Sequence, residues 1–324
     1  MKAAWYTHNG DAKDVLVVGD MPTPQAGPGE VRVALKTSGV NPSDVKNRKG
    51  RPLVSERYIP HSDGAGVIDQ VGAGVDASRM GQRVWTWNAQ YKRPFGTAAQ
   101  YILLPQAQAH PLPDGTDFAA GACMGIPGLT AIQAVHLAGD LKGKTVLVTG
   151  APSAVGHYVS QMVMLAGGRV IGTAGSQAKA DHAISVGVKD WINYKTESVA
   201  ERVKSLTHGK GVDAIIDMDF STTATWLPQG VLAPEGQLIC YGSNAAETPL
   251  SFRSLLINAY QLKFFIVYEL NAADRARSLA DLNDLLSQKK LVHGIGPRFS
   301  LDQIVAAHEC VEAGRDIGNV VIDI

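Results

Sequence analysis

The stretch 144–172 reads as a strand, a tight turn, a helix and a second strand. The apolar run 146–148 is typical of a strand buried on both faces, and over 157–165 the apolar positions recur at helical spacing. The residues of 150–156 between them are mostly small, as a sharp turn requires. Because such a turn leaves free backbone N–H groups at the positive end of the helix dipole, the stretch predicts an α/β domain with a phosphate-binding turn.

The turn matches the dinucleotide-binding fingerprint at two of its three glycines. The matching positions are Gly150, Ser153 and Gly156, so the middle glycine is replaced by serine. We interpret the turn as the seat of a pyrophosphate, bound by Gly150, Ser153, Ala154, Val155 and Gly156. The alternative is a tight turn in another kind of α/β domain.

The end of the second strand bears on which dinucleotide is bound. NAD sites place an acidic residue there to hold the ribose 2′-hydroxyl, but 172–176 contains none. An acid would repel a 2′-phosphate, so its absence permits NADP(H), and Ser176 and Lys179 offer donors. The alternative for Lys179 is an ordinary solvated lysine on a helix.

Composition excludes several classes of protein. Lys plus Arg and Asp plus Glu both number 30, and this balance argues against a protein that coats nucleic acid or an anionic membrane. No apolar run approaches the ~20 residues of a membrane span, and the N-terminus shows no secretory signal. The three cysteines are far apart and form neither a disulfide framework nor a zinc knuckle. We therefore expect a cytoplasmic location.

The chain divides by pattern into a β-rich part and a part in which strands and helices alternate. Short strands with Gly and Pro punctuation dominate 1–124, which suggests a barrel-like β domain. We expect one of these strands at 15–18, and we expect 41–44 to form a turn that leads into one helical turn. Strands and helices alternate over 125–267, as in a doubly wound parallel sheet. We expect 268–324 to fold back onto the first domain.

Over nearly its whole length the chain resembles the zinc-free quinone oxidoreductase (zeta-crystallin) group of the medium-chain dehydrogenase/reductase superfamily. The motifs that carry the resemblance are 39–44, 60–68, 81–84, 125–131, 192–194 and 307–309, together with the turn at 150–156. The resemblance implies a GroES-like catalytic domain (1–124 and 268–324), a Rossmann NADP(H)-binding domain (125–267), a nicotinamide in the cleft between them, and a homodimer or homotetramer.

The resemblance also bears on zinc. Alcohol dehydrogenases of this superfamily hold a catalytic zinc with a Cys and a His, and the matching positions here are Asn41 and Ser62. Neither an amide nor a hydroxyl replaces those ligands, so we expect no metal. The neighbouring Asp63 is expected to brace the domain by pairing with a basic side chain.

Several site residues are assigned by the resemblance alone. It places the amide of Asn41 and the hydroxyl of Thr130 at the substrate or the nicotinamide, as catalytic residues. The alternatives are a turn asparagine before Pro42 and an ordinary helix threonine. It assigns the rest of the cofactor site to Tyr194, Gly242, Ser243 and Arg315.

Without a Lewis acid, the chemistry that remains natural is hydride transfer to an electron-poor acceptor. The aromatic loop 85–95 suggests a pocket for a flat conjugated molecule, with Trp87 and Tyr91 in its lining; plain barrel packing is the alternative. Tyr58 and Tyr91 are candidate proton donors near this pocket. The resulting hypothesis is an NADPH-dependent quinone oxidoreductase. The alternatives are an NADPH-dependent reductase of enones or enals, and an NADPH-binding protein without turnover.

Overall fold

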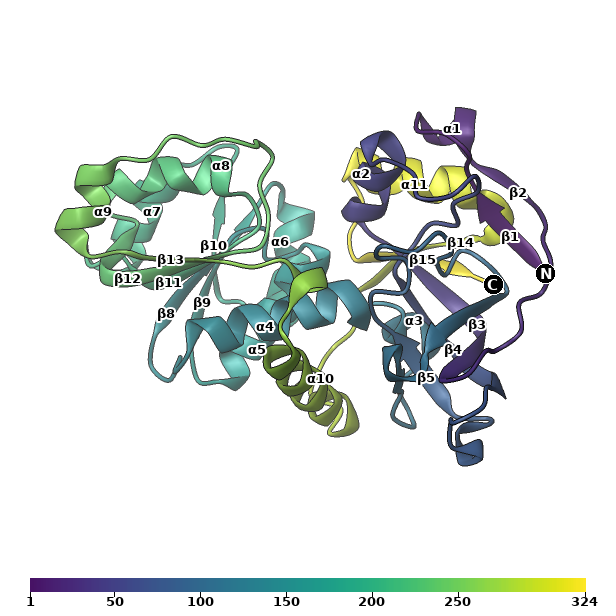
Figure 1. Ribbon diagram of the computed structural model, residues 1–324. Coiled ribbons are helices and arrows are strands. Elements are labelled where there is room, and N and C mark those ends of the chain that lie inside the picture. The colour runs from purple at the N-terminus through teal and green to yellow at the C-terminus, as the bar shows by residue number, and fades with distance from the viewer. The chain divides into compact units, whose positions relative to one another are not determined.

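The computed structural model describes residues 1–324, and the chain forms two compact units (Figure 1). The first unit comprises Met1–Gly128 and Leu282–Ile324, and the second comprises Leu129–Asp281. No helix is long and apolar enough to cross a membrane.

The second unit is built on a six-stranded sheet in which every neighbouring pair of strands is parallel. Its order is β10-β9-β8-β11-β12-β13, with β8 at Thr145–Val148, β9 at Arg169–Ala174, β10 at Asp190–Asn193, β11 at Val212–Asp217, β12 at Leu232–Cys240 and β13 at Gln261–Phe264. Its helices are α4 (Leu129–Ala138), α5 (Ala154–Leu165), α6 (Gln177–Ile184), α7 (Val199–Leu206), α8 (Phe220–Thr223), α9 (Phe252–Asn258) and most of α10 (Ala272–Ser287). This arrangement confirms the predicted doubly wound parallel sheet.

The central strands are apolar because both faces of the sheet are covered. Leu147, Ile171 and Ile215 are fully buried in a cluster that also holds residues of α7 and β12. The order of the strands reverses at β8, which lies between β9 and β11. In sheets of this class, ligands bind beyond the carboxyl ends of the strands at such a reversal.

The first unit is mainly antiparallel. Its larger sheet has the order β14-β15-β3-β4-β5-β7, with β6 also pairing with β3, and β1 pairs with β2 in a second sheet. The strands are β1 (Lys2–Trp5), β2 (Val17–Asp20), β3 (Glu30–Val40), β4 (Asp63–Val71), β5 (Arg83–Thr86), β6 (Tyr101–Pro105), β7 (Ala109–Pro111), β14 (Ile295–Ser300) and β15 (Asn319–Asp323). Because β15 pairs with β3, the end of the chain is part of this sheet.

Short helices complete both units. In the first unit these are α1 (Ala12–Val15), α2 (Pro42–Gly50), α3 (Phe118–Gly121) and α11 (Ile304–Ala313). Short 3-10 helices lie at η1 (Ala77–Arg79), η2 (Gln106–Gln108), η4 (Ala224–Gln229), η5 (Val267–Glu269) and η6 (Leu301–Gln303), and η3 (Met124–Gly128) is a π-helical turn.

Three features differ from the sequence-based expectations. The segment 15–18, expected to be one strand, is the end of α1 followed by the start of β2. The helix after Asn41 runs for nine residues rather than one turn. Residues 268–281 belong to the second unit, because Arg275 donates to the carbonyl of Val267 and Ser278 bonds to Gln133 of α4.

Candidate functional site

The turn between β8 and α5 requires glycine at both of its ends. Gly150 has φ +63°, and a Cβ there would lie 2.2 Å from the sulfur of Met218. A Cβ on Gly156 would lie 2.2 Å from the carbonyl oxygen of Gly150. The chain therefore passes so close to itself that neither position accepts a side chain without a shift of the backbone or of Met218.

The serine at the middle position caps the helix. The hydroxyl of Ser153 accepts a hydrogen bond of 3.1 Å from the N–H of Gly156, and this satisfies one of the free donors at the start of α5. Ala154 and Val155 lie in the same first turn and are partly exposed. Their N–H groups have no partner within the helix and remain suited to a phosphate oxygen.

Polar side chains gather where β9 and β10 end. Ala174 of β9 pairs with Asn193 of β10, so the residues that follow the two strands are neighbours. Ser176 caps α6 by accepting from the N–H of Lys179 at 3.4 Å. A Cβ on Gly175 would lie 2.7 Å from the hydroxyl of Tyr194 and 3.2 Å from Cε of Lys195.

The arrangement brings the predicted Ser176, Lys179 and Tyr194 to one edge of the sheet and adds a residue that sequence reasoning missed. Lys195 is exposed and supplies a further cation beside Gly175. Its place directly after Tyr194 was the available signal in the sequence. The binding roles of all four stay predictions.

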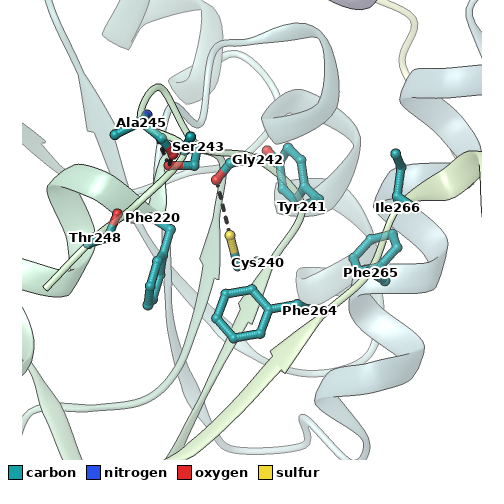
Figure 2. A pocket seen from close by; sticks show the side chains of 11 residues that line it. Phe220, Cys240, Tyr241, Gly242, Ser243, Ala245, Thr248, Phe264, Phe265 and Ile266 are labelled. Carbon is teal, nitrogen blue, oxygen red and sulfur yellow. Dashed lines mark hydrogen bonds between the residues drawn. The ribbon is translucent and has the colours of Figure 1, made fainter. Parts of the chain in front are cut away.

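A cavity of about 560 Å³ lies beside the carboxyl ends of β12 and β13 (Figure 2). The predicted Gly242 and Ser243 line it, and Gly242 must be glycine because a Cβ there would lie 2.6 Å from the carbonyl oxygen of Met218. The rings of Phe220 and Phe264 meet edge to face, with centroids 5.0 Å apart, in the same wall. Sequence reasoning did not identify these two aromatic residues.

The loop at this cavity is held by Asp219. Its carboxylate accepts from the backbone N–H and the side-chain amide of Asn244, and from the hydroxyls of Ser221 and Thr222. Burial alone would raise the pKa of Asp219, but these hydrogen bonds outweigh it and lower the pKa. The charge of Asp219 is therefore engaged in fixing residues 242–245.

In the first unit, Asn41 is buried between two carboxyl groups. Its backbone N–H donates to Asp44 at 2.8 Å, and its side-chain amide donates to Asp63 at 3.0 Å. Asp63 also accepts from the N–H of Ile126. The expectation that Asp63 pairs with a basic side chain is wrong, because its partners are an amide and a backbone N–H.

The remaining predicted residues lie in varied surroundings. Tyr58 is buried and its ring packs on Tyr6, while the ring of Tyr91 stacks with Arg51. The indole N–H of Trp87 donates to the carbonyl of Ala107. In the second unit, Thr130 is buried near the start of α4, and in the first unit Arg315 is exposed after α11. The cavity beside β12 and β13 is not lined by any of these five, and their roles stay predictions.

A buried histidine pair connects α11 to β3 in the first unit. Nε2 of His61 is 3.0 Å from Nε2 of His308, and Nδ1 of His61 is 2.9 Å from the hydroxyl of Ser38. Ser38 bonds to Thr97, whose hydroxyl donates to the carbonyl oxygen of Asp63. Because Thr97 donates to a carbonyl oxygen, Ser38 must donate to Thr97. His61 then donates from Nδ1 to Ser38, and His308 donates from Nε2 to Nε2 of His61. Both imidazoles are neutral in this pattern.

The histidine pair predicts a loss of stability in acid. Burial first, and then Arg48, lower the pKa of His308 to about 3, and burial lowers that of His61 well below its usual value. Since both folded-state pKa values lie below the unfolded value of about 6.5, the stability is present above that pH and is lost as the pH falls. We expect each histidine to lower the free energy of unfolding by about 1 kcal/mol as the pH falls from 6.5 to 5.5.

Urea denaturation of the wild type and of His308→Gln over this range measures the effect. The variant should be less stable at pH 7.5 but should lose less stability on acidification. Parallel pH profiles for the two proteins would contradict the neutral pair.

The residues at the zinc positions of the superfamily do not form a ligand set. The structure has no group of three or more His, Cys, Asp or Glu side chains that could hold a metal ion. Asn41 is engaged by Asp44 and Asp63, and Ser62 is a buried hydroxyl. Carboxamide and hydroxyl groups are poor ligands for a catalytic zinc.

Comparison with known proteins gives consistent results. A family model described as alcohol dehydrogenase GroES-like domain matches residues 27–114, and one described as zinc-binding dehydrogenase matches residues 154–284. A quinone oxidoreductase of Pseudomonas aeruginosa is 30% identical over 320 residues, which cover 95% of this chain and 95% of that protein. A 2-haloacrylate reductase of a Burkholderia species is 28% identical over 337 residues, which cover 99% of each.

A solved structure shows the same fold with a nucleotide. A mycobacterial protein complexed with NADPH superposes with a TM-score of 0.87 at 26% sequence identity, and the superposition covers 100% of both chains. Together with the GroES-like match, it confirms the predicted combination of a GroES-like domain and a doubly wound dinucleotide-binding domain.

Proposed function

The chain belongs to the quinone oxidoreductase family of the medium-chain dehydrogenase/reductase superfamily, and we propose that it reduces a quinone with NADPH and without a bound metal. The observation that carries the cofactor assignment is the turn at Gly150 and Gly156. There the backbone leaves no room for side chains and α5 begins with free N–H groups.

The residues present fit a phosphorylated dinucleotide. Ala154 and Val155 would bind the pyrophosphate through their N–H groups, and Ser176, Lys179, Tyr194 and Lys195 would surround the 2′-phosphate. Gly242 and Ser243 would lie beside the ribose of the nicotinamide. When bound, NADPH supplies the hydride, so the chain's own contribution is binding, orientation and electrostatics.

Metal-free chemistry is supported by the environment of Asn41. Its amide already donates to Asp63, and the other position that corresponds to a zinc ligand of alcohol dehydrogenases carries the buried hydroxyl of Ser62. Such a site can orient a carbonyl by hydrogen bonding but does not supply a strong Lewis acid. A quinone or another activated acceptor needs no such activation, and solvent can protonate the reduced product.

The second candidate function is reduction of an activated C=C bond. It is favoured by the similarity to a 2-haloacrylate reductase, whose named substrate carries a C=C bond conjugated to a carboxylate. NADPH oxidation with a 1,4-naphthoquinone, a straight-chain enone and 2-chloroacrylate separates the two. We expect the highest kcat/KM with the quinone. Turnover of the enone alone would favour the second function, and tight NADPH binding without turnover of any acceptor would favour a binding protein.

The 2′-phosphate site predicts that an acid at position 176 reverses the preference for NADPH. Aspartate caps helices as well as serine does, so Ser176→Asp should leave α6 intact and add one negative charge beside the phosphate. We expect the Kd of NADPH to rise about 10- to 100-fold and that of NADH to change little. Fluorescence titration measures both constants.

Ser176→Asn is the matched control, because it keeps a capping side chain without the charge. Its NADPH affinity should stay within about threefold of the wild type. If the Asp and Asn variants weakened NADPH equally, the 2′-phosphate would not lie at this position.

We also infer a homodimer that forms through the edge of the six-stranded sheet. β13 is an edge strand, and the apolar side chains of Phe252, Leu256, Ile257 and Phe264 on α9 and β13 are more than half exposed. An unpaired sheet edge beside an exposed apolar patch offers a surface on which a second copy of the chain can pair and pack.

The three cysteines are free thiols, which suits the reducing cytoplasm.

A further inference from the structure

The carboxyl groups of Asp44 and Asp63, which bond to Asn41, are in surroundings that disfavour the ionisation of both. Asp44 and Asp63 are each almost fully buried, and Oδ1 of Asp63 lacks a hydrogen-bond partner. Oδ2 of Asp44 accepts from the backbone N–H of Asn41, and Oδ2 of Asp63 accepts from the Asn41 amide and from the N–H of Ile126. An unpartnered buried carboxylate oxygen is costly unless it carries a proton.

The absence of a side chain at Gly125 leaves room for Oδ1 of Asp63. A Cβ on Gly125 would lie 2.3 Å from this oxygen and 2.4 Å from the carbonyl oxygen of Thr86. Glycine at 125 therefore lets the carboxyl group approach the backbone. No basic side chain bonds to either carboxyl group, although Arg48 lies on the same helix as Asp44 and pairs with Glu312.

The groups that face the pair do not neutralise it. The charge of Asp44 raises the pKa of Asp63. Tyr6 and Tyr58 lie near Asp44, and Cys123 lies near Asp63. Burial raises the pKa of Asp44 to about 7 despite its hydrogen bonds from Asn41 and Ser62. Burial, and then Asp44, raise the pKa of Asp63 well above its usual value.

We propose that Asp44 and Asp63 are positioning residues for Asn41 that work as a pair carrying at least one proton, held on Oδ1 of Asp63. Oδ2 of Asp63 accepts two N–H groups, so a proton on Oδ1 leaves both bonds in place. The amide nitrogen of Asn41 then faces Asp63, and its orientation is fixed. When both carboxyl groups are ionised, their repulsion weakens the hydrogen bonds that orient Asn41.

The proposal rests on the proposed function only in that Asn41 is assumed to contact the acceptor or the nicotinamide. The protonation of the two carboxyl groups does not depend on that assumption and can be tested on the protein without nucleotide. Asp63→Asn is the informative variant, because its NH₂ group can replace the protonated Oδ1 while its oxygen still accepts from Asn41 and Ile126.

The first test is infrared spectroscopy of the protein without nucleotide. At pH 8.5, where Asp44 is ionised, the wild type should show the C=O stretch of a buried protonated carboxylic acid, and this band should be missing from Asp63→Asn. Asp14→Asn, a change at an exposed carboxylate of the same unit, should leave the band unchanged. A wild-type spectrum that matches that of Asp63→Asn in this region would overturn the proposal, whatever the enzyme's activity.

The second test is the pH profile of NADPH-dependent naphthoquinone reduction. In the wild type kcat should hold while Asp44 alone is ionised and should fall only at the more alkaline pH where Asp63 ionises beside the Asp44 anion. In Asp44→Asn and Asp63→Asn the pair cannot become doubly charged, so this alkaline fall should be absent. Asp63→Ala, which removes the acceptor of the Asn41 amide, should lower kcat about tenfold while the Kd of NADPH stays within about twofold.

Identical pH profiles in the wild type and in Asp44→Asn would overturn the positioning role. If Asp63→Asn does not fold, Asp44→Asn still decides both tests, because its infrared band should persist while the alkaline fall in kcat should be lost. If no protein turns over any quinone, the proposed function fails and the infrared result alone decides the proton.

Discussion

Replacing Gly156 with alanine is expected to remove most of the NADPH affinity. The new Cβ would lie 2.2 Å from the carbonyl oxygen of Gly150 and 3.0 Å from the α-carbon of Ala151, both of which are backbone atoms of the turn. The start of α5 must move away from β8 to accommodate it. We expect the Kd of NADPH to rise more than about 30-fold and the unfolding free energy to fall by about 1–3 kcal/mol.

The control for this variant is Gly139→Ala in the same unit. Gly139 has φ +73°, but nothing lies within 4 Å of a Cβ there, so alanine adds backbone strain without a collision. Its stability should fall by about 1 kcal/mol with unchanged NADPH affinity. If Gly156→Ala bound NADPH as tightly as the control, the turn would not be the nucleotide site. Fluorescence titration and urea denaturation give both quantities.

The double variant Leu256→Asp and Ile257→Asp is expected to be monomeric. Both side chains are 66% exposed on α9, which leads directly into the edge strand β13. Burying two carboxylates in an apolar interface costs about 2–4 kcal/mol for each, so the dimer Kd should rise by about 10³-fold or more. Sedimentation analysis at micromolar concentration measures the change.

Val54→Asp is the matched control, because Val54 is 62% exposed but belongs to the first unit, whereas α9 and β13 belong to the second. It should sediment like the wild type. A wild-type protein that is monomeric at the same concentrations, or a double variant that remains a dimer, would exclude this face as the interface.

The local pattern of the chain was sufficient to predict the doubly wound sheet. The buried strand at 146–148 and the helical period that follows are set by residues close in sequence, so periodicity identifies them. The segment 15–18 was misassigned because a short apolar run is compatible with either a helix end or a strand. The boundary near 268 was wrong because it depends on contacts of Arg275 and Ser278 that no local pattern encodes.

The candidate site was predictable where backbone geometry sets it and not where side chains meet. Gly150 and Gly156 follow from the turn, whereas Ser176 was expected as a donor and is found to cap α6. The partners of Asp63 are 22 and 63 positions away in sequence, so its bonds to Asn41 and Ile126 appear only in the fold. Phe264 was missed for the same reason, since its contact with Phe220 is distant in sequence, and Lys195 was missed although it directly follows Tyr194.

The most direct test of the central claim is a single-turnover measurement of NADPH oxidation by 1,4-naphthoquinone on protein treated with a chelator, with the zinc content of the same sample determined. We predict oxidation at the rate of the untreated protein, with far less than one zinc per chain. A rate that is lost on chelation and restored by Zn²⁺, or the absence of any NADPH oxidation, would contradict metal-free hydride transfer from NADPH to a quinone.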